Sequence, residues 1–404
     1  MDELRELLKT IDVSRLSSNL SSLFDEALLN QQAKETGFIV RNRSGLSGCM
    51  FLIMNVLELV NYPNNSLQEQ CEWLEENYGV RLTKQSLDER YNTFAVTFMR
   101  SCFERLLSGW IKGHKITELK SGFERIFLQD STTYQLPATM RAFYPSKDAS
   151  KTGASLKLDY CFNYLDGKVE QLILESGRVP DSKINTMYEP NLRSKDLIIK
   201  DLGYWNCKQF EAYNKSGIYF LSRLKTDSSL YDLSTKNKIN IEDFLPDDQQ
   251  IKCFHCLLGT QKTPVRVSIE KVPEYVRIER LEKLNKQAKS QNWTLSTLRI
   301  KLCGYNLYVT NASEELLPTS LIRLLYSIRW QIELIFKAWK SVLSLDEVKS
   351  MSVFRVECML YGRLILILLN NNLQSFFKQQ IADIEEYKDF ELSEMKATKT
   401  LKKR

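Results

Sequence analysis

The segment Leu156-Lys-Leu-Asp-Tyr-Cys-Phe-Asn-Tyr164 decides the fold class, because large apolar side chains alternate along it with mostly polar ones. A period of two residues is typical of a β-strand. Asp166-Gly167 follows as a hairpin-turn signal, and residues 168–175 are suited to the return strand. The sequence therefore predicts a β-hairpin in this region.

Two short apolar runs flank this hairpin, and each ends in a carboxylate. They are Arg125-Ile-Phe-Leu-Gln-Asp130 and Asp196-Leu-Ile-Ile-Lys-Asp201. With a short helix after Asp181, a helix over 208–215 and a strand over 218–224, the order becomes β, β-hairpin, α, β, α, β. This order predicts an α/β core with a mixed sheet, as in an RNase H-like fold. Functional sites in open α/β sheets form at the carboxyl ends of strands, so we expect Asp130 and Asp201 to lie together.

Residues 1–120 form a predicted all-α N-terminal domain, because apolar residues recur in it at helical spacing. Ser66 and Glu69 make a capping box for a helix that ends at Gly79, and another helix begins near Thr83. The pair has the outline of a helix-turn-helix, with Lys84 and Arg90 as candidate DNA contacts, although any helical hairpin shares that outline. Charge argues against DNA binding, since residues 1–125 hold 15 Lys and Arg against 17 Asp and Glu.

The rest of the chain divides by its patterning. Residues 121–226 form the first part of the core, 227–312 a mostly β insertion subdomain, and 313–375 the helical remainder of the core. Residues 376–404 form a C-terminal segment whose last nine residues carry five basic side chains and no acidic one. This tail is either a solvated end or a DNA contact.

Composition excludes several classes of protein. The chain has 404 residues, 43% of them hydrophobic, and a net charge of +6 that is too mild to prove a nucleic-acid partner. Nine cysteines without a signal peptide indicate free thiols in the cytoplasm, and two histidines leave little room for a His-rich zinc enzyme. No apolar stretch reaches the length of a membrane span.

A third carboxylate comes from a helix predicted over 320–343. At 100° per residue, Tyr326, Arg329, Glu333, Lys337 and Lys340 share about 80° of its surface. One reading is a solvated face with ion pairs at i,i+4 spacing. The other places Glu333 beside Asp130 and Asp201, where three mutually repelling carboxylates would be relieved by Mg²⁺ or Mn²⁺. Two such ions suit in-line displacement at phosphorus.

The spacing Tyr326-x2-Arg329-x3-Glu333-x6-Lys340 resembles the Tyr-Arg-Glu-Lys signature of the DDE transposases of the insertion-sequence 4 family. The segments that begin at Gln129, Lys200 and Gly217 resemble the family's two catalytic Asp segments and the strand that follows them. The resemblance covers about 124–345, and the N-terminal domain only by arrangement.

This resemblance implies cut-and-paste transposition by cleavage and strand transfer at terminal inverted repeats. It implies that Asp130, Asp201 and Glu333 hold two metal ions, Mg²⁺ with Mn²⁺ as a substitute. It further implies double-stranded transposon ends and target DNA as partners, a homodimer in the end complex, and an N-terminal domain that reads the ends. The implied phosphate contacts are Tyr326, Arg329, Lys340, Arg223 and Lys225.

The residues leave alternative site residues and alternative functions open. Asp159, Asp166 and Asp181 are rival carboxylates; a turn explains Asp166 and helix capping explains Asp181. Cys253-Phe-His-Cys256 lacks a second ligand pair for zinc, and we expect small buried residues there. Trp293 could stack on an unpaired base but more simply packs, and Trp330 and Trp339 are expected in or near the core. The rival functions are a domesticated nuclease of the same fold and a catalytically silent DNA-binding regulator.

Overall fold

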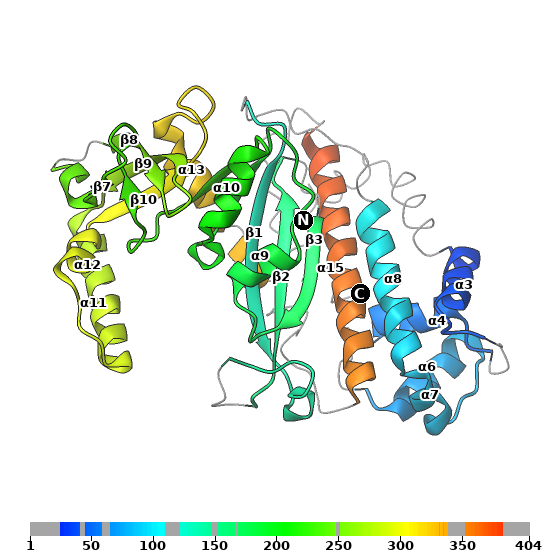
Figure 1. The fold of residues 1–404 in the computed structure, drawn as a ribbon. Helices are drawn as coiled ribbons and strands as arrows, with labels where there is room; N and C mark the ends of the chain where they lie inside the picture. Colours follow the sequence, from blue (N-terminus) through cyan, green and yellow to red (C-terminus); the bar gives the residue numbers. More distant parts are fainter. Residues whose placement is uncertain are drawn as a thin grey trace, which may run out of the picture.

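The fold is a mixed α/β arrangement in which one long sheet carries helices on both faces (Figure 1). The computed structural model describes residues 25–40, 45–58, 65–109, 122–147, 152–165, 169–247, 251–330, 332–333, 335–337 and 352–382. Ten strands pair in the order β3-β2-β1-β4-β5-β10-β9-β8-β6-β7. Within the described ranges no helix is both long and apolar enough to cross a membrane.

The first five strands form the mixed part of the sheet. β1 pairs antiparallel with β2 and parallel with β4, β2 pairs antiparallel with β3, and β4 pairs parallel with β5. The predicted order of elements along the chain and the mixed sheet are therefore confirmed. The predicted hairpin is also present, and its turn at Asp166-Gly167 lies outside the described residues. The bounds are β1 Ile126–Gln135, β2 Ser155–Asn163, β3 Val169–Ser176, β4 Leu197–Lys200 and β5 Tyr219–Arg223.

β1 differs from the prediction in its length. It was expected to end at Asp130 but continues to Gln135, because β2 pairs with it as far as Gln135 while the parallel pairing with β4 stops at Gln129. Asp130 therefore lies inside the strand, at the point where the parallel ladder ends. β2 alternates in sequence but is buried on both faces, because it lies between β1 and β3 and helices cover the sheet.

The insertion extends the same sheet. β10 pairs antiparallel with β5, so the strands of residues 227–312 continue the core sheet. Residues 265–269 and 305–310 lie in strands, and the charged stretch 276–291 lies in a helix. The bounds are β6 Leu230–Tyr231, β7 Lys238–Ile239, β8 Ile251–Leu258, β9 Thr263–Lys271, α11 Glu274–Gln291, α12 Thr297–Leu302 and β10 Tyr305–Thr310.

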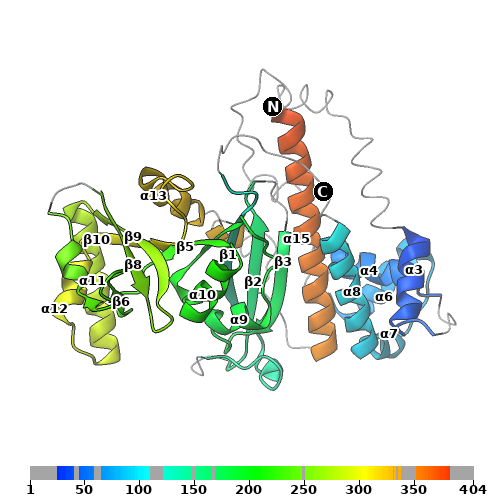
Figure 2. The same cartoon turned by 45° about the horizontal axis from the view of Figure 1, so that its top comes forward.

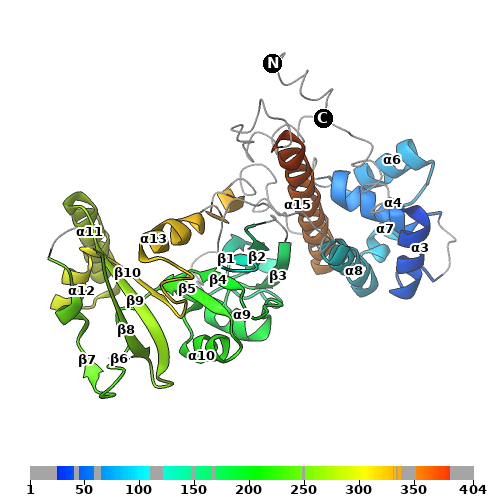
Figure 3. The same cartoon turned by 90° about the horizontal axis from the view of Figure 1, so that it is seen from above.

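The two faces of the sheet have separate cores. Figure 3 shows α9 (Asp181–Met187) and α10 (Cys207–Lys215) on one side of the sheet and α13 (Thr319–Ile328) on the other. Phe127, Ile198 and Phe220 point to the α10 side and pack there with Phe210 and Tyr213. Leu128, Ile199 and Leu221 point the opposite way, into the core that contains residues of α13 and α15 (Val353–Ala382).

The N-terminal helices share this second core. α8 (Thr93–Gly109) runs along α15 and also approaches β3 at the edge of the sheet (Figures 1 and 2). Phe103 of α8 lies 6.0 Å from the ring of Tyr361. Gly362 faces the π-helical turn Met54–Glu58, where a Cβ would collide with the carbonyl oxygen of Asn55. The remaining helices are α3 Glu26–Glu35, α4 Gly48–Ile53, α6 Leu67–Tyr78 and α7 Lys84–Arg90.

The predicted signals around α6 are confirmed. Ser66 and Glu69 form a complete capping box, and Gly79 ends the helix in the left-handed conformation with φ of 67°. Thr83 caps α7, which has only seven residues. The apolar run over residues 364–369 lies within α15, where those residues are mostly buried.

Candidate active site

Three carboxylates from three separate elements meet on the α13 side of the sheet. The parallel ladder ends at the Gln129–Lys200 pair, so the next residues are neighbours: Asp130 within β1 and Asp201 directly after β4, on the same face of the sheet. Glu333 comes from the helical residues that follow α13. The predicted convergence of Asp130, Asp201 and Glu333 therefore agrees with the geometry.

One guanidinium group contacts all three carboxylates. Arg329 Nη1 donates to Asp130 Oδ2 at 2.7 Å, and Arg329 Nη2 donates to Glu333 Oε1 at 2.7 Å. Arg329 Nε lies 3.8 Å from Asp201 Oδ1, and this buried nitrogen has no hydrogen-bond partner among the described residues. The Arg329 and Asp130 side chains are only 12% and 14% exposed. Arg329 therefore offsets part of the negative charge that the three carboxylates bring together.

Arg329 reaches this position because the helix is interrupted. α13 ends at Ile328, Arg329 is its C-cap, and the backbone N–H of Ile332 bonds to the Arg329 carbonyl three residues earlier. The prediction of one continuous helix over 320–343 is therefore wrong at this residue. Trp330, expected in or near the core, is 55% exposed beside the break. Lys340 and Trp339 lie outside the described residues.

Tyr326 supports the second carboxylate. Its hydroxyl donates to Asp201 Oδ1 at 3.3 Å, and its ring lies 5.2 Å from that of Tyr308 in β10. Burial, followed by the negative charge of Asp201, raises the pKa of Tyr326, so the hydroxyl remains a proton donor. Tyr326 thus holds Asp201 in place.

The carboxylates differ in their electrostatic surroundings. Burial raises the pKa of Asp130 to about 6, although Arg329 and the backbone N–H of Ser131 oppose the rise. Burial alone would lower the pKa of Arg329, but the hydrogen bond to Glu333 and the nearby carboxylates raise it overall. Asp201 and Glu333 are 39% and 38% exposed, so two of the three carboxylates are open to solvent.

A buried arginine that the sequence analysis missed anchors the start of α13. Arg266 of β9 is 2% exposed and contacts Glu314, Thr319 and the carbonyl oxygens of Ser313 and Leu317. These contacts fix the helix that carries Tyr326 and leads to Arg329. The available signal was the cation between Val265 and Val267 in an apolar strand.

The rival carboxylates lie elsewhere. Asp159 is fully buried on the opposite face, where it accepts hydrogen bonds from Gln129 Nε2 and the Tyr204 hydroxyl. Asp181 starts α9 and pairs with Lys157 at 2.5 Å. Asp166 lies outside the described residues. Neither Asp159 nor Asp181 belongs to the Arg329 cluster.

The donor atoms of the cluster suit a hard divalent cation, since all are carboxylate oxygens. As the side chains stand, no group of three His, Cys, Asp or Glu residues in the described ranges closes tightly enough to hold an ion. The guanidinium of Arg329 lies between the carboxylates, so ion binding requires that it move. Cys253 and Cys256 of β8 are exposed and buried respectively; only Cys256 matches the expected small buried residue, and the pair makes no zinc site.

The other predicted DNA contacts are dispersed. Arg223 ends β5 as an exposed side chain, and Lys225 lies 3.4 Å from Asp227. Lys84 is exposed in the first turn of α7, and Arg90 is half-buried in its last turn.

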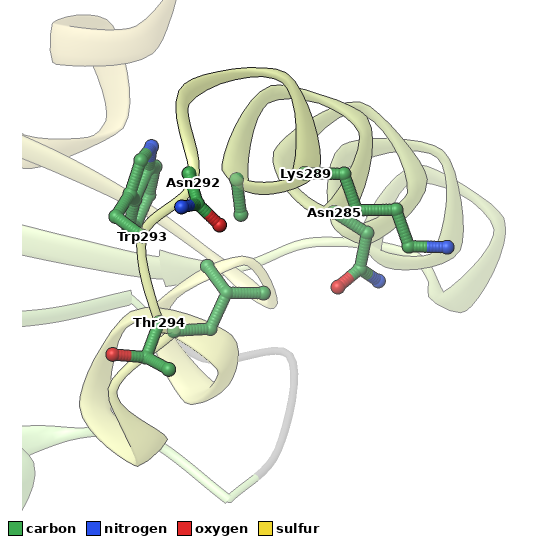
Figure 4. A pocket seen from close by; sticks show the side chains of 7 residues that line it. Asn285, Lys289, Asn292, Trp293 and Thr294 are labelled. Atoms are coloured by element: carbon green, nitrogen blue, oxygen red, sulfur yellow. The ribbon is translucent and has the colours of Figure 1, made fainter.

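Trp293 is half-buried and lies far along the insertion, at an open pocket of about 580 Å³ that follows α11 (Figure 4). The guanidinium of Arg299 covers its ring at 4.9 Å from the centroid. The expectation that Trp293 packs is therefore only partly met.

Comparisons with known proteins give a consistent result. Residues 121–369 match the family model described as Transposase DDE domain. The transposase for insertion sequence element IS1151 of Clostridium perfringens is 28% identical over 408 residues, covering 95% of this chain and 84% of that protein. The transposase for IS231F of Bacillus thuringiensis subsp. israelensis is 29% identical over 390 residues, covering 91% and 81%. A piggyBac transposase synaptic complex with hairpin DNA has a TM-score of 0.48 at 10% identity, covering 94% of this chain and 77% of that chain.

Proposed function

The chain belongs to the DDE transposase family, whose domain model spans residues 121–369, and we propose that Asp130, Asp201 and Glu333 are its catalytic carboxylates. The protein is a DNA transposase, an enzyme that cleaves DNA. The proposed reaction is cut-and-paste transposition of an insertion sequence by strand cleavage and transfer at terminal inverted repeats. The observation that carries the site assignment is the convergence of the three carboxylates on Arg329.

DDE transposases use divalent metal ions, and we propose Mg²⁺ here, with Mn²⁺ able to replace it. When bound by the three carboxylates, two such ions would activate water and stabilise the leaving oxygen at phosphorus. The donor set favours these ions over zinc because it consists of oxygen atoms alone.

The chain's own residues have separate tasks in this proposal. The Tyr326 hydroxyl holds Asp201 in orientation. Arg329 offsets part of the negative charge of the carboxylates before DNA binds and then turns to the phosphate oxygens at the cleaved end, for which its planar donors are suited. We assign Lys340 to the same phosphates on the spacing of the motif.

The domain roles follow from the same reasoning. We infer that β1–β5 form the RNase H-like core and that residues 227–312 are the insertion. Residues 313–375 then complete the core. Residues 1–120 would read the transposon ends, with Lys84 and Arg90 as contacts, and the enzyme would act as a homodimer on two ends. The 376–404 segment, with its basic tail, remains unassigned.

Cleavage of a labelled duplex that carries the element's own ends tests the proposal. In Mg²⁺ we expect wild type to cut, and Glu333→Gln to bind the ends with at least about 10³-fold slower cleavage. Asp159→Asn is the matched control, since this buried carboxylate lies on the opposite face. If Glu333→Gln cuts like wild type, the site assignment is wrong. If wild type cuts but joins no ends to target DNA, the nuclease alternative replaces transposition.

A further inference from the structure

A row of cross-strand neighbours leads from the carboxylates into the insertion. Arg223 pairs with Tyr308, and Tyr308 pairs with Ser268, so these side chains share one face of β5, β10 and β9. Asp201 lies on that face as well, because Leu221 and Ile199 pair and residues two apart point the same way. Tyr308 contacts Tyr326, which binds Asp201. The row therefore starts at the active site.

Three arginines from three elements gather along this row. Arg223 ends β5, Arg280 comes from α11 and Arg323 from α13. Arg280 donates to the carbonyl oxygen of Tyr305 at 3.0 Å and to Asn306 Oδ1 at 2.7 Å. Arg323 donates to Glu270 Oε1 at 2.8 Å.

Asn306 and Glu270 link the two arginine contacts. The two residues pair across β10 and β9, and Asn306 Nδ2 donates to Glu270 Oε2 at 3.2 Å. The guanidinium of Arg223 has no hydrogen-bond partner within the described part of the chain. Arg280 and Arg323 are thus linked through Asn306 and Glu270, and Arg223 lies close enough for its charge to act on Arg280.

The charge on this surface is unbalanced. Burial, followed by the positive charge of Arg223, lowers the pKa of Arg280, and Arg323 adds to the effect. Glu270 is 15% exposed and pairs with Arg323, which is 63% exposed. Three guanidinium groups around one carboxylate leave unused donors facing solvent, and a polyanion is the ligand that such donors recognise.

We propose that Arg223, Arg280 and Arg323 form a phosphate-binding track that holds the backbone of the DNA strand running from the scissile phosphate across β5, β10 and β9. The inference rests on the proposed function and adds Arg280 and Arg323 to its DNA contacts. From β4 to β9 the track crosses three strand spacings, roughly 14 Å. That length corresponds to about four nucleotides of a B-form strand.

The salt dependence of DNA binding tests the track. Full-length protein is titrated, without divalent ions, against a labelled duplex that carries the element's end, at several salt concentrations. Each phosphate contact contributes about 0.9 to the slope of log K against log salt. We expect Arg223→Gln, Arg280→Gln and Arg323→Gln each to reduce the slope by about one, on unrelated DNA as well. When salt rises from 50 to 200 mM, the affinity of both proteins for DNA should fall. The factor by which it falls should be roughly 40 times smaller for the triple variant than for wild type.

Two further variants separate charge from structure. Arg280→Lys keeps the charge and should keep the slope, whereas Arg280→Gln should not. Glu270→Gln removes the competing carboxylate and should tighten binding, an effect that loss of packing does not produce. Arg277→Gln is the control, because Arg277 lies on α11 but pairs with Glu274 at 2.5 Å.

The outcomes distinguish the two levels of the proposal. If wild type binds and cuts the ends but the triple variant keeps the wild-type slope, the track is wrong and the proposed function stands. If wild type binds no DNA, the proposed function fails, and the track fails with it.

Discussion

Removal of Arg329 should make the carboxylate site a better metal site. In Arg329→Gln the cation that contacts Asp130, Asp201 and Glu333 is lost, so a divalent ion no longer competes with it. A charge pair 4 Å apart contributes about 4 kcal/mol at an effective dielectric constant of 20. Asp201 and Glu333 are more than one-third exposed, so solvent screening reduces this energy to about 1.4 kcal/mol. Arg329→Gln should therefore bind a divalent ion about tenfold more tightly than wild type.

Free Mn²⁺, counted by electron paramagnetic resonance, gives the affinity without DNA. Arg323→Gln serves as the control because Arg323 lies on the same helix but pairs with Glu270. Glu333→Gln should weaken Mn²⁺ binding and so identify the site. The same Arg329→Gln protein should cut DNA slowly, because the phosphate contact is lost. Equal Mn²⁺ affinities in wild type and Arg329→Gln would refute the position of Arg329 between the carboxylates.

Four further substitutions test the scaffold, the first three by denaturant unfolding and the last by DNA cleavage and binding. Burial raises the pKa of Asp159, so its ionisation costs stability as pH rises; Asp159→Asn should be more stable than wild type at pH 7, with a gap that narrows in acid. Asp159→Ala should instead lose about 1–3 kcal/mol, because the Tyr204 hydroxyl loses its acceptor. Gly362→Ala should lose about 1–3 kcal/mol through collision with Asn55. Arg266→Met should slow cleavage more than it weakens DNA binding, since it frees the start of α13.

Local signals predicted the individual elements well. The capping box at Ser66 and the left-handed Gly79 depend on residues within one turn, so the sequence shows them directly. The order of the strands along the chain followed from the alternation of apolar and polar residues and from the carboxylates at the ends of apolar runs. The joining of the insertion to the core sheet was not predictable in this way, because the pairing of β10 with β5 joins residues more than 80 positions apart.

The site shows how far helical periodicity predicts the positions of side chains. Projection at 100° per residue placed Arg329 beside Glu333, and that ion pair exists at 2.7 Å. The same projection assumed a continuous helix, whereas α13 ends at Ile328. It put Trp330 at about 40°, outside the apolar face, so the expectation that Trp330 lies in or near the core had no support from periodicity, and the side chain is exposed.

The choice between a surface ion pair and a catalytic site could not be made from the helix alone, because both readings predict the Arg329–Glu333 contact. The second contact of the Arg329 guanidinium distinguishes the two readings. Arg329 Nη1 binds Asp130, a residue 199 positions earlier in the chain, and both side chains are largely buried. A solvated ion pair contributes only about a few tenths of a kcal/mol, which does not offset the cost of desolvating a second carboxylate in the centre of a sheet. The arrangement therefore favours the proposed catalytic site over a surface ion pair, with Arg329 as the cation that lies between the three carboxylates.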